Sequence, residues 1–138
     1  MDTVVYPGRY ESLDKISRHI EAVSRNAGFD ESSIYAIQTA VDEACTNIID
    51  HAYGGESPGV IVIDCVTTDN VLKITLHDHG RPFNPKSIPR SVKHERLKDV
   101  REGGLGLYFM HHLMDEIYFD FSPDKGNTLV MIKHRPGR

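Results

Sequence analysis

The sequence has few of the features that mark secreted, membrane or nucleic-acid-binding proteins. It contains two cysteines and no tryptophan, and no apolar run is long enough to cross a bilayer. No charged-then-apolar signal segment is present at the start. The net charge of -4 gives no general reason to expect binding to nucleic acid or to an anionic membrane. We therefore expect a cytoplasmic protein without a direct nucleic-acid or membrane partner.

The two cysteines do not form a recognisable redox or metal motif. Cys45 falls in an expected helix and Cys65 in an expected strand, without CxxC spacing. We expect both cysteines to be small buried residues of the core. With 138 residues, of which 39% are hydrophobic, the chain is expected to form one domain over residues 1–138.

The order of the expected elements places helices first and strands mostly after them. Helical spacing of apolar residues predicts a helix over Ser12–Ala27 and another from Asp30 or Ser32 to about Tyr53, ended by Gly54-Gly55. Further elements are a strand near 3–7, strands over 60–66 and 71–78, a helix over 104–114, and a closing hairpin of 117–121 with 128–133. This order indicates an α+β fold, a two-layer α/β sandwich whose mixed, mostly antiparallel sheet carries helices on one face.

The second helix carries two polar residues four positions apart, Glu43 and Asn47. That spacing stacks a carboxylate and a carboxamide on one side of the helix, expected opposite the apolar stripe and beside the small residues Ala36 and Ala40. The pair suits metal binding and activation of a hydroxyl. Taken alone, it is more typical of a solvent-exposed helix face.

The expected strand over 71–78 ends in a carboxylate on its apolar face. Leu72, Ile74 and Leu76 alternate on one side, and Asp78 is next on that side. A buried carboxylate needs a partner, and the amino group of a purine would suit it. Because Gly80 has no side chain, a flat ring could come close to the backbone there. The alternative is an aspartate that starts a turn.

Glycines open the expected third helix in the segment GGLGL over 103–107. Backbone N–H groups at a helix start attract anions, so this segment suits phosphate. It is not a P-loop, because no Gly-Lys-Ser/Thr follows, and Phe109 stands where a dinucleotide fingerprint has its third glycine. A single GxG is equally consistent with a hinge.

Together these segments resemble the ordered boxes of the Bergerat-fold ATPases, the superfamily of gyrase, histidine kinases and heat-shock chaperones. The boxes are Glu43-x-x-x-Asn47, Asp78-x-Gly80-x-x-Phe83, Gly104-x-Gly106-Leu107 and Gly126-Asn127-Thr128. The phrases VDEACTNIIDHAY, DHGRPFNP, GGLGLYFMHHLMDEI and GNTLVMIK are most similar to the stand-alone anti-sigma factor serine/threonine kinases. The resemblance covers nearly the whole chain.

The resemblance implies a role for each matching residue. Asn47 would bind Mg²⁺, and Glu43 would be the catalytic base that orients or deprotonates the attacking hydroxyl. The ATP-binding residues would be Asn47, Asp78, Gly80, Gly104, Gly106, Leu107 and Thr128, with Asp78 accepting from the adenine amino group and the Thr128 hydroxyl near the adenine.

The resemblance also implies partners. The chain would phosphorylate an anti-anti-sigma antagonist, bind a sigma factor and form a homodimer through its opening strand and first helix. The alternative is a non-catalytic, nucleotide-dependent switching module of the same fold, for which Glu43 would have no use. The segment 84–102 would be a lid over the nucleotide. It contains six Lys or Arg residues and three acidic residues. This excess of positive charge is suited to binding phosphate or an acidic partner, and it is equally typical of a solvated loop.

Overall fold

The computed structural model describes residues 2–81, 110–122 and 124–136. Residues 110–113 are helical, which matches the end of the helix predicted over 104–114, and its beginning lies outside the described residues. No helix of the described part is long and apolar enough to span a membrane. The elements follow in this order: β1 (Asp2–Pro7), α1 (Glu11–Asn26), α2 (Glu31–Asn47), η1 (Ile48–Ala52), β2 (Val60–Thr68), β3 (Val71–Asp78), β4 (Glu116–Ser122) and β5 (Gly126–His134).

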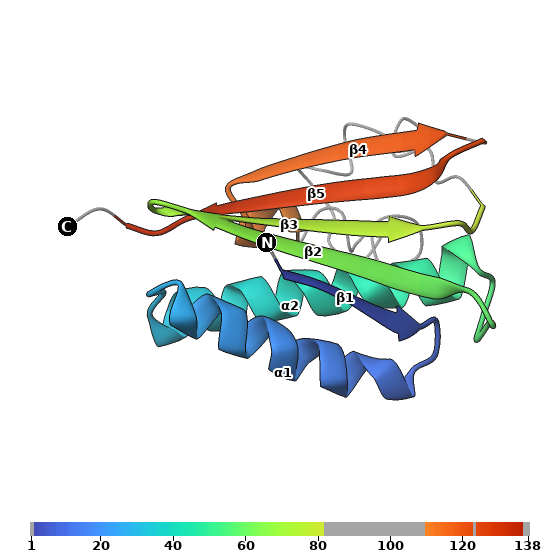
Figure 1. Cartoon of the computed structure of the whole chain (residues 1–138), viewed down its shortest axis with the longest axis horizontal. Coiled ribbons are helices and arrows are strands. Elements are labelled where there is room, and N and C mark those ends of the chain that lie inside the picture. Colours follow the sequence, from blue (N-terminus) through green and yellow to red (C-terminus); the bar gives the residue numbers. More distant parts are fainter. Residues whose placement is uncertain (1, 82–109, 123, 137–138) are drawn as a thin grey trace.

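One five-stranded sheet, in the order β1-β2-β3-β5-β4, forms one layer of the domain. Every pairing between the described strands is antiparallel. Helices α1 and α2 lie side by side and form the second layer (Figure 1). The predicted α+β sandwich is therefore confirmed, with a sheet that is antiparallel throughout its described strands.

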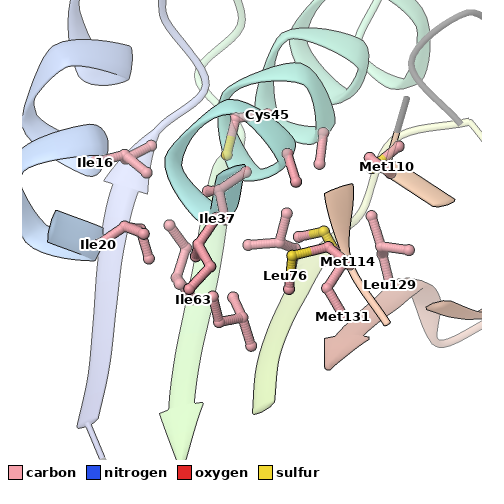
Figure 2. Close-up of a cluster of buried hydrophobic side chains, with 14 of the residues drawn as sticks. Ile16, Ile20, Ile37, Cys45, Ile63, Leu76, Met110, Met114, Leu129 and Met131 are labelled. Carbon is pink, nitrogen blue, oxygen red and sulfur yellow. The ribbon is translucent and has the colours of Figure 1, made fainter. Parts of the chain in front are cut away.

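The core lies between the helices and the inner face of the sheet (Figure 2). Alternate residues of β2 and β3 are buried, as expected for a sheet that is covered on one face. Helix α1 contributes Ile16 and Ile20, which are four residues apart and fully buried. Cys45 and Cys65 are both buried and free, as predicted. Burial raises the pKa of the Cys65 thiol to about 12, so it stays protonated at neutral pH.

Helix α2 begins where the sequence predicts and ends in an altered turn. The side chain of Asp30 caps its start by accepting from the N–H of Ser33 at 2.8 Å. Its final turn, η1, is a π-helix, in which the N–H of Tyr53 donates to the carbonyl of Ile48, five residues earlier, at 2.9 Å. Such turns are frequent at functional sites.

The buried face of α2 is wider than the single predicted stripe. Ala40, expected beside Glu43 and Asn47 on the outer side, has no exposed surface. The helix packs on the sheet and also on α1, where Gln38 donates to the backbone oxygen of Ser17 at 3.1 Å. Glu43 and Asn47 are half-buried as a result. They flank the buried face, and the expectation that they lie opposite it is wrong.

Candidate functional site

A pocket opens where the end of α2 and η1 meets the end of β3 and the start of β5. Most of its lining side chains are apolar, and a few polar groups converge among them, as in many small-molecule sites. The described residues that line it are Ala44, Asn47, Ile48, His51, Ala52, Asp78, Met110, Phe119, Asn127, Thr128 and Leu129. The pocket therefore gathers residues that are far apart in the sequence, including members of three of the predicted boxes.

Asp78 is the buried carboxylate of this pocket. It has 4% of its surface exposed and lies on the inner face of β3, as predicted. Its Oδ1 accepts from the N–H of Gly80 at 2.8 Å and from Nδ2 of Asn127 at 2.9 Å. Since both of these bonds are made by Oδ1, Oδ2 is the oxygen available to a donor in the pocket.

The structure shows a packing reason for a glycine at position 80. A Cβ built on Gly80 would lie 2.5 Å from the carbonyl carbon and oxygen of Ala52. The same segment is bonded to the helix end, because the N–H of Arg81 donates to the Ala52 carbonyl at 2.7 Å. Gly80 is not among the described residues that line the pocket. Its lack of a side chain allows β3 to dock on η1, and this docking fixes Asp78 relative to Asn47.

Replacement of Gly80 with alanine is expected to destabilise the fold by about 3 kcal/mol, because the new Cβ overlaps backbone atoms that cannot move separately. Thermal unfolding without nucleotide measures the loss. Gly54→Ala is the matched control: its Cβ has room, with Arg81 Nη2 nearest at 3.9 Å, but its φ is +73°. Backbone strain alone should cost that variant about 1 kcal/mol. Equal losses in the two variants would contradict the steric explanation.

Asn47 and Glu43 lie one helical turn apart on α2. Asn47 lines it directly, whereas Glu43 is half-buried and is not among the described lining residues. Partial burial raises the pKa of the Glu43 carboxyl, and the nearby charges of Asp42 and Asp50 raise it further. A carboxylate with a raised pKa is better suited to accept a proton near neutral pH.

The structure shows where the Thr128 hydroxyl lies. Thr128 pairs with His77 across β3 and β5, and its Oγ1 is 3.0 Å from Nδ1 of His77. Strand alternation places both side chains on the face of the sheet opposite to Asp78. Thr128 lines the pocket, but the side chain beside Asp78 is that of Asn127.

Gly104, Gly106 and Leu107 lie outside the described residues, as does the predicted lid over 84–102. Their expected contacts with phosphate stay predictions. The described part of the site offers three chemical functions: a buried oxygen for an amino group, an amide oxygen for a hard cation, and a carboxylate that can accept a proton.

The chain is similar to several known proteins. The family model of the histidine kinase-like ATPase domain matches residues 6–133. The serine-protein kinase RsbW of Bacillus thuringiensis is 33% identical over 132 residues, covering 93% of this chain and 81% of the relative. RsbW of Listeria monocytogenes is 30% identical over 129 residues, covering 91% of this chain and 80% of the relative.

Solved structures confirm the fold. A Mycobacterium tuberculosis protein with RsbU and RsbW domains has a TM-score of 0.69 at 18% identity, covering 100% of this chain and 34% of that one. The catalytic domain of histidine kinase ThkA has a TM-score of 0.55 at 15% identity, covering 98% and 97%. The chain therefore belongs to the histidine kinase-like ATPase domain family and, within it, to the relatives of the RsbW serine-protein kinases.

Proposed function

We propose that this chain is a cytoplasmic, ATP-dependent serine/threonine protein kinase that acts as an anti-sigma factor. Its substrate is a serine or threonine of an anti-anti-sigma antagonist, and its second partner is a sigma factor. The observation that carries the proposal is that Asp78 and Asn47 line one pocket, with Glu43 one helical turn before Asn47 on α2. The names of the relatives, serine-protein kinases RsbW, support the same activity.

Each residue has a separate task in binding ATP. Asp78 accepts a hydrogen bond from the adenine amino group, and Asn47 gives its side-chain oxygen to Mg²⁺. The described residues contain no group of three His, Cys, Asp or Glu side chains that could hold an ion by itself. Asn47 would hold Mg²⁺ through its side-chain oxygen, since this hard cation takes oxygen ligands. Bound Mg²⁺ supplies charge neutralisation at the phosphates.

For phosphoryl transfer, Glu43 accepts the proton of the substrate hydroxyl. The hydroxyl oxygen bonds to the γ-phosphorus, the bond from that phosphorus to the β–γ bridging oxygen breaks, and ADP leaves. The phosphate contacts implied by the resemblance, from the backbone N–H groups of Gly104 and Gly106 in the box that ends at Leu107, belong to this proposal, as does the lid over 84–102; these residues lie outside the described structure. The raised pKa of Glu43 supports its assignment as the base.

Incubation with labelled ATP and the cognate antagonist tests the proposal. Transfer of label to a serine or threonine of the antagonist is expected. ATP binding without transfer to the antagonist would reject the kinase function and leave the non-catalytic switching module.

The transfer rate should fall at acidic pH, because Glu43 must be ionised to accept a proton. Its raised pKa places this fall above the ordinary glutamate value of about 4.3. Removing the negative charge of Asp42 lowers the pKa of Glu43, so Asp42→Asn should move the acidic limb to lower pH. A pH–rate profile under saturating ATP measures the shift. A limb that stays in place in Asp42→Asn would contradict the assignment of that limb to Glu43.

A homodimer is also proposed, with β1 and α1 at the contact. Strand β1 is at an edge of the sheet, and Val5 on it is 56% exposed. Edge strands are common sites of pairing between chains. Light scattering at micromolar concentration should give a mass of two chains, and a mass of one chain would count against the dimer.

A further inference from the structure

Asn127 is the buried polar residue beside Asp78. Only 3% of its surface is exposed, and it is the strand partner of Asp78 between β5 and β3. Its Nδ2 donates to Oδ1 of Asp78 at 2.9 Å and to the carbonyls of Gly80 at 3.2 Å and Arg81 at 3.0 Å. One half of this side chain thus holds the end of β3 in place.

These contacts determine which way the amide points. All three atoms around one terminal atom of the side chain are oxygens that accept hydrogen bonds. An amide oxygen at that position would face three acceptors, whereas an NH₂ group can donate its two hydrogens to them, with one hydrogen shared between two acceptors. The other terminal atom is therefore the oxygen, Oδ1.

Oδ1 of Asn127 is buried and has no hydrogen-bond partner among the described residues. A buried acceptor without a donor costs roughly 1–3 kcal/mol. Asn127 lines the pocket together with Asp78, so a ligand in the pocket can bring the missing donor. A donor that reached this atom would find two acceptors on neighbouring strands, Oδ2 of Asp78 and Oδ1 of Asn127.

We propose that Oδ1 of Asn127 is a second acceptor for the 6-amino group of adenine, alongside Asp78. The inference rests on the proposed function, in which the pocket binds ATP. An amino group has two hydrogens, and the two acceptors use one each. A purine with an oxygen at position 6 would place an acceptor against two acceptors, so the pair also rejects guanine nucleotides.

Three nucleotides test this assignment by calorimetry: ATP, purine riboside triphosphate, which lacks the amino group, and N6-methyl-ATP, which keeps one of its hydrogens. The wild-type chain should bind ATP more than tenfold more tightly than either analogue. If Asp78 were the only acceptor, N6-methyl-ATP could turn its remaining hydrogen to Asp78 and bind about as tightly as ATP. Equal affinity of the wild type for these two nucleotides would overturn the proposal.

Asn127→Ala makes room for the methyl group and removes the second acceptor. The preference for ATP over N6-methyl-ATP should fall to about twofold or less. If the role of Asn127 were purely structural, Asn127→Ala would lower the affinity for both nucleotides by the same factor. An unchanged preference for ATP would therefore also overturn the proposal. Asn70→Ala, in the turn at the opposite end of β3, is the matched control and should keep the wild-type preference. Failure of the wild type to bind any of the three would reject the proposed function itself.

Discussion

Replacing Glu43 with glutamine is expected to reduce phosphoryl transfer by about 10²- to 10⁴-fold, the usual contribution of a positioned base. Glutamine has nearly the same shape but cannot accept the hydroxyl proton. ATP binding should change little, because Asp78 and Asn47 are untouched and Glu43 is not among the described residues that line the pocket. Single-turnover transfer and nucleotide calorimetry measure the two effects separately.

Stability should not account for this loss. The raised pKa of Glu43 means that folding disfavours its charged form, so a neutral glutamine should leave the free energy of unfolding unchanged or slightly higher at neutral pH. Asp42→Asn is the matched control, since it removes a carboxylate from the adjacent position, which faces about 100° away around the helix. It should retain most of the rate above the acidic limb. A Glu43→Gln rate equal to that of the wild type would show that another group takes the proton.

Local patterns in the sequence predict most of the fold. The alternation of Leu72, Ile74 and Leu76 predicts β3 with the bounds that the structure has, and it places Asp78 on the inner face. The cap at Asp30 similarly fixes the start of α2. These features depend on neighbours in the chain, so periodicity and capping rules can find them.

The features that the sequence does not reveal depend on contacts between distant segments. The requirement for glycine at position 80 comes from the backbone of Ala52. Ala52 is the last residue of the π-helical turn η1, and this turn sets the position of its backbone. The spacing of apolar residues does not reveal that turn. A π-helical turn shifts the backbone hydrogen bonds by one residue, and this shift requires no particular residue types.

Asn127 could have been found from the sequence. It alternates with Leu129 and Met131 on β5, so the same rule that placed Asp78 on the buried face places Asn127 there and Thr128 on the other face. The family box drew attention to the hydroxyl of Thr128. Strand alternation is the better guide within a box, because a one-residue step reverses the face of the sheet.

Replacing Asp78 with asparagine is expected to weaken ATP binding by about 100-fold, the loss of a hydrogen bond to a charged acceptor. The N–H of Gly80 and Nδ2 of Asn127 both donate to Oδ1, so they should hold the new amide with its oxygen in that place. The NH₂ group then replaces Oδ2 and meets the adenine amino group as a second donor. Calorimetry with ATP measures the loss, and the fold should persist because both bonds to Oδ1 remain.

Asp78→Asn replaces an acceptor with a donor in the pocket, so its effect on a nucleotide that carries an acceptor at position 6 should be the opposite. A nucleotide with an oxygen at position 6, such as ITP, offers an acceptor to the new NH₂ group, so the preference for ATP over ITP should shrink in Asp78→Asn. General damage to the pocket would lower the affinities for ATP and ITP equally and leave the preference unchanged. Asp64→Asn on β2, whose carboxylate accepts from Thr3 outside the pocket, is the matched control and should bind ATP as the wild type does. Wild-type affinity for ATP in Asp78→Asn would mean that the buried carboxylate holds the sheet end in place and does not read the base.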